Sequence, residues 1–221
     1  MSEDSLFIFI IEMLGTVAFA ISGIRLAAAK RFDWFGAYVV GLVTAIGGGT
    51  VRDILLDIPV FWMQTVSFLA VTFLSLVVVI IFRKVLVRGM RTVFIFDAIG
   101  LALFVVVGIE KTLVEGYPMW VAIVMGIITG SFGGITRDIL INEEPLFFRK
   151  DIYATACLAG GVVYWLTSLI PGVPVIVPQI ACAVAVVGLR VAAVHWDWSL
   201  PILQIDETDL PAETRNDRED A

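Results

Sequence analysis

The chain has 221 residues, of which 59% are hydrophobic and only 16% are charged, and its mean hydropathy is +0.96. A water-soluble domain of this size needs more polar surface, so the composition excludes a soluble globular protein and indicates an integral membrane protein. The net charge of −6 arises in residues 197–221, which carry eight acidic and two basic side chains. We expect this polar tail to be disordered and the membrane part, which is neutral overall, to have no nucleic-acid partner.

Seven apolar stretches are long enough to cross a bilayer as helices, which takes roughly 17–25 residues. In chain order they cover residues 5–28, 35–58, 61–83, 92–114, 118–141, 152–170 and 174–194. The acidic start MSED lacks the basic residues of a secretory signal, so we expect the first stretch to be retained as a helix. The fold class predicted is therefore an all-α membrane protein with seven transmembrane helices.

The distribution of lysine and arginine predicts the orientation, because cytoplasmic loops carry an excess of both. With the N-terminus outside and the C-terminus in the cytoplasm, the external helix ends hold little more than Lys111. The cytoplasmic ends then hold Arg25, Lys30, Arg31, Arg83, Lys84, Arg88, Arg91, Arg149, Lys150 and Arg190.

The second and fifth stretches share a phrase, TAIGGGTVRDIL from residue 44 and TGSFGGITRDIL from residue 129. The offset of 85 residues also matches four positions in other stretches, namely Glu12 with Asp97, Gly15 with Gly100, Gly23 with Gly108 and Gly41 with Gly126. Each copy holds three stretches, an odd number, so the second copy enters the membrane from the opposite side. The sequence therefore predicts an inverted repeat, in which a site lies at the repeat interface near mid-membrane.

This repeat divides the chain into four predicted parts. Residues 5–85 form the first three-helix unit and residues 90–172 form the inverted second unit. Residues 173–196 add a seventh helix without a counterpart, and residues 197–221 form the acidic tail.

The glycine clusters Gly47–Gly49 and Gly133–Gly134 lie inside predicted helices. Each interior glycine costs about 1 kcal/mol relative to alanine, so we expect the triplet to unwind its helix and both helices to be kinked. Carbonyls freed there could face a dehydrating cation, whereas the alternative is that small residues let two helices cross closely. Five hydroxyls could line the narrowing or bond their own helices: Thr44, Thr50, Thr129, Ser131 and Thr136.

An Arg-Asp pair follows each glycine cluster, and its arginine needs a partner inside the membrane. Adjacent residues on a helix do not face each other, so other carboxylates are expected to supply that partner. At 1.5 Å per residue, Arg52 and Glu12 both lie a few ångströms to one side of the midplane. Arg137 and Asp97 lie at matching depths on the other side. We predict the pairs Arg52–Glu12 and Arg137–Asp97, and no pair between the repeats such as Arg52–Asp138.

Two charged clusters result, and the charge count favours cations. If all groups are ionised, Glu12, Arg52 and Asp53 sum to −1, and the equivalent Asp97, Arg137 and Asp138 do the same. A purely structural alternative stays open: Asp53 and Asp138 could neutralise the N-terminal dipoles of short half-helices.

The seven stretches, the 3+3 inverted repeat and the phrases GGGTVRD and GGITRD resemble the prokaryotic branch of the trimeric intracellular cation (TRIC) channels, over about residues 5–194. The resemblance implies a multi-pass homotrimer in the inner membrane, surrounded by lipids, with one hourglass pore per subunit that conducts potassium and sodium. It implies no cofactor and no metal beyond the permeant K+ or Na+. The pore residues implied are Gly47, Gly48, Gly49, Arg52, Asp53, Gly133, Gly134, Arg137 and Asp138.

Two features leave alternatives open. Phe132 precedes only two glycines in the second copy, so the halves are not equivalent, and this ring could gate the path or simply pack. A broken-helix inverted repeat also suits a secondary transporter of a small zwitterion such as glycine, in which Arg52 and Arg137 would bind the carboxylate. An enzyme is not expected, because there is no HExxH motif and the single histidine, His195, follows the last apolar stretch.

Overall fold

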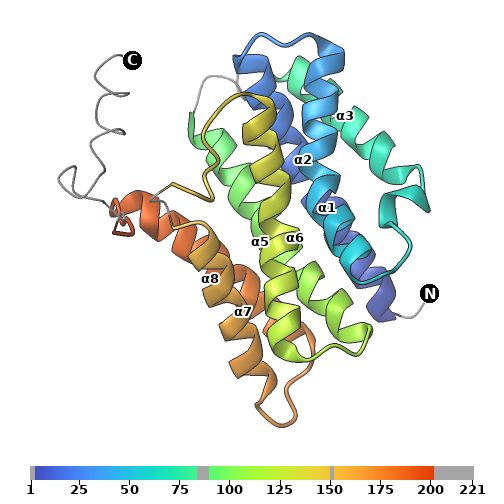
Figure 1. The fold of residues 1–221 in the computed structure, drawn as a ribbon, viewed down its shortest axis with the longest axis vertical. Helices are drawn as coiled ribbons and strands as arrows, with labels where there is room; N and C mark the ends of the chain where they lie inside the picture. The colour runs from blue at the N-terminus through green and yellow to red at the C-terminus, as the bar shows by residue number, and fades with distance from the viewer. Residues whose placement is uncertain (1–2, 84–89, 150–151, 202–221) are drawn as a thin grey trace, which may run out of the picture.

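The computed structural model describes residues 3–83, 90–149 and 152–201, and this part of the chain is helical throughout its core. Most of the predicted tail therefore lies outside the described residues. The predicted all-α fold with seven main helices is confirmed (Figure 1). The elements are α1 (Glu3–Ala29), α2 (Trp34–Leu55), the 3-10 helix η1 (Phe61–Met63), α3 (Ser67–Ile81), α5 (Met90–Val114), α6 (Met119–Leu140), α7 (Ala154–Ser168) and α8 (Ile176–His195).

Five of the helices, α1, α2, α5, α6 and α8, are long and apolar enough to cross a membrane. Helices α3 and α7 have 15 residues each, or roughly 22 Å at 1.5 Å per residue, which is less than a 30 Å hydrocarbon core. The prediction that the third helix begins at residue 61 is wrong, because α3 begins at Ser67. The preceding segment folds back on the end of α2, where the Phe61 amide donates a hydrogen bond to Asp53.

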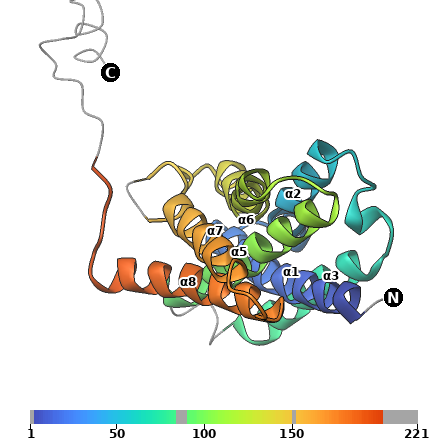
Figure 2. The same ribbon diagram turned by 90° about the horizontal axis from the view of Figure 1, so that it is seen from below.

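The two repeats lie side by side around α1 and α5. In Figure 1 the start of α1, the α5–α6 connection and the α7–α8 connection are at the lower end, and the α1–α2 connection is at the upper end. Figure 2, seen from below, places α3 on one side of this centre and α8 on the other. Successive helices thus run in alternating directions, as seven membrane crossings require.

The inverted repeat is visible in how α1 and α5 pack. The rings of Phe19 and Phe104 stack with centroids 5.3 Å apart, and these residues are separated by the 85-residue offset. Phe19 lies over Gly100 and Phe104 lies over Gly15, so that an added Cβ would be 2.4 and 3.0 Å from the ring atoms. Each contact is the symmetry equivalent of the other, which places the pseudo-two-fold axis between these two rings.

The other matched glycines set the spacing within each repeat. A Cβ on Gly23 of α1 would lie 3.0 Å from the Cα of Gly41 on α2. A Cβ on Gly108 of α5 would lie 2.8 Å from the Cα of Gly126 on α6. The backbones of α1 and α2, and of α5 and α6, are therefore in close contact at equivalent places, which holds α2 and α6 in position for the site described next.

Candidate functional site

Helices α2 and α6 touch through their backbones at the duplicated phrase. A Cβ on Gly48 would lie 2.0 Å from the carbonyl oxygen of Thr129, and a Cβ on Gly133 would lie 2.1 Å from that of Thr44. These two contacts are equivalent under the 85-residue offset. The predicted unwinding at the triplet is wrong, since α2 is helical from Trp34 to Leu55 and α6 from Met119 to Leu140. The close-crossing alternative describes these glycines.

The other glycines of the duplicated phrase lie next to this crossing, and its hydroxyl side chains bond within their own helices. Gly49 accommodates the Phe61 ring and Gly134 the Tyr153 hydroxyl, whereas a Cβ on Gly47 would be in ordinary contact at 3.5 Å. All five predicted hydroxyls donate to the carbonyl four residues earlier in their own helix, over 2.6–2.8 Å: Thr44, Thr50, Thr129, Ser131 and Thr136. The hydroxyl hydrogens are therefore already used within their own helices.

Phe132 does not occupy the crossing. Its side chain is 39% exposed on the surface of α6, and it lines neither of the two cavities described below. The expectation that this ring gates the path is not supported by its position in the subunit.

Arg52, at the lower end of α2, is fully buried in a cluster of carboxylates. Its Nη2 lies 3.3 Å from Glu12 Oε1, so the predicted pair is confirmed. The expectation that neighbouring residues cannot pair is wrong, because Arg52 also reaches Asp53 Oδ1 through Nε at 2.8 Å and Nη2 at 2.6 Å. The long arginine side chain bends back along its own helix, which simple helical spacing does not consider.

Arg137, at the upper end of α6, forms the equivalent cluster. Its Nη1 pairs with Asp97 Oδ1, as predicted, and its Nε lies 2.8 Å from Asp138 Oδ1. Asp138 Oδ2 accepts a hydrogen bond from the Leu146 amide at 3.1 Å. In the same way, Asp53 Oδ2 accepts a hydrogen bond from the Phe61 amide at 2.8 Å. Both aspartates lie in the last turn of an unbroken helix, so the half-helix dipole alternative is wrong. They instead bind the loops that follow α2 and α6.

Two cluster members come from the opposite repeat, and the sequence analysis missed both. Lys111 Nζ lies 2.6 Å from Glu12 Oε1, and Arg137 Nη1 donates to Ser22 Oγ at 2.9 Å. The repeat equivalents of Lys111 and Ser22 are Leu26 and Val107, which are apolar. With Lys111 the lower cluster has two cations and two carboxylates, so its predicted charge of −1 is corrected to zero. The close packing of α1 against α5 brings these groups together, and no sequence motif indicates this packing.

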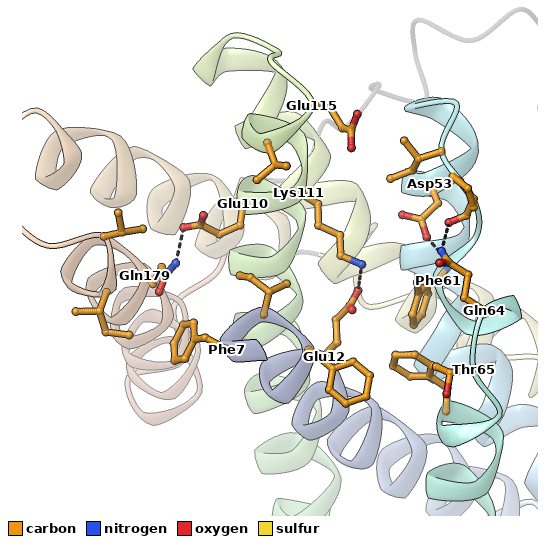
Figure 3. A pocket seen from close by; sticks show the side chains of 18 residues that line it. Phe7, Glu12, Asp53, Phe61, Gln64, Thr65, Glu110, Lys111, Glu115 and Gln179 are labelled. Carbon is orange, nitrogen blue, oxygen red and sulfur yellow. Dashed lines mark hydrogen bonds and ion pairs between the residues drawn. The ribbon is translucent and has the colours of Figure 1, made fainter. Parts of the chain in front are cut away.

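A cavity lies beyond each cluster, on either side of the α2–α6 crossing. The lower one, the Glu12 cavity, has a volume of about 920 Å3 and is lined by residues of α1, α5, α8 and the segment after α2. Figure 3 shows Glu12 and Lys111 facing each other between Asp53 and Glu110. The upper one, the Arg25 cavity, has about 410 Å3 and includes Arg137 and Asp138 in its lining.

The Glu12 cavity contains a second carboxylate network. Glu110 Oε1 accepts a hydrogen bond from the Tyr164 hydroxyl at 2.6 Å and another from Gln179 Nε2 at 2.7 Å. Figure 3 shows Glu110 and Gln179 on the side of the cavity away from Asp53. The network joins α5 to α7 and α8, and so connects the unpaired seventh helix with the repeats.

Comparison with known proteins agrees with this duplicated architecture. A family model described as glycine transporter matches twice, at residues 9–84 and 94–168, with the second match starting 85 residues after the first. The chain belongs to this family. The inner membrane protein YadS of Escherichia coli is 39% identical over 203 residues, which cover 90% of this chain and 98% of YadS. The chain is thus a multi-pass membrane protein.

Solved structures identify the fold. The TRIC channel orthologue from Rhodobacter sphaeroides matches with a TM-score of 0.81 and 33% identity, covering 86% of this chain and 98% of that one. A prokaryotic TRIC channel crystallised in 0.5 M KCl matches with a TM-score of 0.79 and 28% identity, covering 89% and 100%. The resemblance inferred from the sequence is confirmed: the chain has the TRIC channel fold and, like these channels, is not an enzyme.

Proposed function

We propose that this protein is a channel for K+ and Na+, with one pathway in each subunit. The pathway runs from the Glu12 cavity past the Arg52 cluster, the α2–α6 crossing and the Arg137 cluster to the Arg25 cavity. The observation that carries this proposal is the pair of cavities on opposite sides of the crossing, each ending at an arginine–carboxylate cluster. This is the hourglass form expected from two inverted halves.

The chemistry of the clusters suits a cation. Asp53 and Glu12 line one cavity and Asp138 lines the other, and carboxylates along a pathway favour cations over anions. Two buried atoms, Arg52 Nη1 and Asp97 Oδ2, have no hydrogen-bond partner among the described residues. Buried polar atoms in a membrane are tolerated where they border a hydrated space, which supports a pathway beside both clusters.

The crossing itself is the narrowest part of the proposed pathway. Because the Gly48 backbone touches the Thr129 carbonyl, no ion passes between α2 and α6 at this level in the arrangement described. Conduction in this proposal requires a small displacement of the two helices, and the arrangement corresponds to a non-conducting state.

The remaining expectations are part of the same proposal. The related structures are named as trimeric channels, which supports a homotrimer, and YadS is named as an inner membrane protein, which supports that location. The excess of lysine and arginine in the loops at the upper end supports an orientation with the N-terminus outside. Lipids would then cover the exposed apolar side chains of the outer helices.

Bilayer recording under a KCl gradient tests the proposal, with Asp53→Asn and Asp138→Asn as variants. We expect a wild-type reversal potential near the potassium value, since carboxylates line both cavities. Each variant should lose cation conductance severalfold, because each removes one negative charge from the path. A wild-type reversal potential near the chloride value would overturn the proposal.

A second function, transport of a small zwitterion, is favoured by one feature of the site. Lys111 and Glu12 bring both signs of charge into a single cavity, as recognition of an amino acid requires, and the matching family model is described as glycine transporter. Saturable uptake of labelled glycine into proteoliposomes, without unitary currents in bilayers, would identify a transporter. Unitary currents without saturable uptake would exclude it.

Lys111→Met is expected to increase K+ conductance about twofold at low salt. The substitution removes the cationic side chain found among the described lining residues of the Glu12 cavity, while Arg52 remains to pair with Glu12. The factor is that expected when the charge of a site about 8 Å away in water changes by one unit. Single-channel conductance measures it, Lys111→Arg is the control that keeps the charge, and an equal conductance in both variants would show that the charge of Lys111 has no influence on conduction.

A further inference from the structure

The two cavities lie at equivalent positions in the two repeats. Of the twelve residues that line the Arg25 cavity, ten have a repeat equivalent, 85 residues away, in the lining of the Glu12 cavity. The equivalents include Asp53 with Asp138 and Phe61 with Leu146. The cavities thus share their backbone construction, and any functional difference between them must come from side chains that changed after the duplication.

The changed side chains invert the charge at two positions. Arg25 and Lys30 line the Arg25 cavity, and their equivalents in the Glu12 cavity are Glu110 and Glu115. None of the ion pairs formed by the described residues includes either of these glutamates. Glu110 is held by neutral partners, the Tyr164 hydroxyl and the Gln179 amide, so its charge is not compensated.

The glutamates of the Arg25 cavity, in contrast, form ion pairs with cationic side chains. Lys30 Nζ lies 2.5 Å from Glu143 Oε1, and the hydrogen bond and charge of Lys30 lower the pKa of Glu143. Arg149 lies 3.6 Å from Glu143 and 3.8 Å from Glu144. Both glutamates are therefore paired with cations at this end of the protein.

The sum of charges differs between the two ends. The Glu12 cavity and its cluster contain four carboxylates and two cations, a net charge of −2: Glu12, Asp53, Glu110 and Glu115 against Arg52 and Lys111. Among the described residues, the Arg25 cavity and its cluster contain four of each, a net charge of zero: Asp97, Asp138, Glu143 and Glu144 against Arg25, Lys30, Arg137 and Arg149.

We infer that Glu110 and Glu115 make the Glu12 cavity a cation-collecting entrance, so that the channel passes more current when cations enter from this end. The inference rests on the proposed cation conduction. A single charge about 8 Å away in water changes the local cation concentration about twofold when screening is weak. The Debye length is about 30 Å at 0.01 M salt and about 3 Å at 1 M, so the asymmetry is expected at low salt and lost at high salt.

Single-channel recording in symmetrical 10 mM and 1 M KCl tests the inference. In wild type we expect the currents at opposite voltages of equal size to differ about twofold to fourfold at 10 mM, and to be nearly equal at 1 M. Glu110→Gln and Glu115→Gln should each reduce the ratio about twofold, and the double variant should bring it near one. Glu110→Asp is the matched control, because it keeps the charge and should keep the asymmetry.

Modification of an introduced cysteine identifies which recording chamber the Glu12 cavity faces. In Glu115→Cys, an anionic thiosulfonate reagent added to one side should restore the asymmetry, and a cationic one should bring the ratio near one, because it leaves the Glu12 cavity neutral. The native Cys157 and Cys182 have no exposed surface in the described structure, so the introduced thiol is expected to dominate the response of this variant. A reagent that acts from one side only also reports the orientation of the inserted channel.

The possible results separate the inference from the proposed function. Cation-selective currents that are symmetrical at 10 mM, or whose asymmetry survives the double Glu→Gln change, would overturn the inference and leave cation conduction intact. An absence of unitary cation currents from correctly folded wild-type protein would overturn both.

Discussion

Gly48→Ala is expected to destabilise the protein by roughly 3 kcal/mol or more, at the upper end of the cost of overpacking. The new methyl carbon would be 2.0 Å from the Thr129 carbonyl oxygen, and the obstacle is helix backbone, which cannot rotate away as a side chain can. Gly133→Ala places its methyl 2.1 Å from the Thr44 oxygen and should have a similar effect. The thermal midpoint and gel-filtration profile of the detergent-solubilised protein measure both effects.

Gly47→Ala is the matched control one residue away. Its added methyl would meet the Gly133 Cα at 3.5 Å, an ordinary contact, and alanine is preferred over glycine in a helix by about 1 kcal/mol. We expect this variant to be at least as stable as wild type. If Gly48→Ala were equally stable, the backbone contact between α2 and α6 would not be the reason for glycine at this position.

Arg137→Met is expected to destabilise the protein by roughly 3–5 kcal/mol, the cost of leaving a buried charge without its partner. Asp97 and Asp138 both lose their ion pair, and no other ion pair among the described residues includes them. Arg52→Met should cost less, because Glu12 keeps its contact with Lys111. Thermal midpoints of the two variants give the comparison directly.

The double variant Arg137→Met with Asp97→Asn provides the control for this second prediction. Removing the orphaned carboxylate together with the arginine should recover part of the lost stability, since the cost comes from the uncompensated charge. A larger loss for Arg52→Met than for Arg137→Met would contradict the assignment of Lys111 as a supporting partner of Glu12.

The membrane depth of charged residues could be predicted from the sequence. The period of 85 residues and the odd number of helices per repeat established the inversion, and a rise of 1.5 Å per residue then placed Arg52 beside Glu12 and Arg137 beside Asp97. This worked because depth is a one-dimensional quantity, which helix length and position along the chain determine without knowledge of side-chain packing.

Lateral contacts could not be predicted in this way. Intrinsic propensity predicts that the glycine triplet unwinds, but close packing of α2 on α6 is a tertiary contact that outweighs a cost of about 1 kcal/mol per residue. In the sequence Lys111 indicates only the orientation of a helix end, because its partner, Glu12, is 99 residues away on another helix. Helical period and charge counts contain no information on which helix lies opposite which.

The reciprocal contact of Gly48 with Thr129 and of Gly133 with Thr44 has a consequence for the history of the chain. It is isologous, the kind of interface that two identical subunits make with one another. Two separate copies of a single three-helix unit could therefore have met through the same surface before their genes were joined. In such a homodimer every substitution appears twice, so an arginine at one entrance requires an arginine at the other. A single polypeptide has no such requirement, so the equivalent positions Arg25 and Glu110 can carry opposite charges.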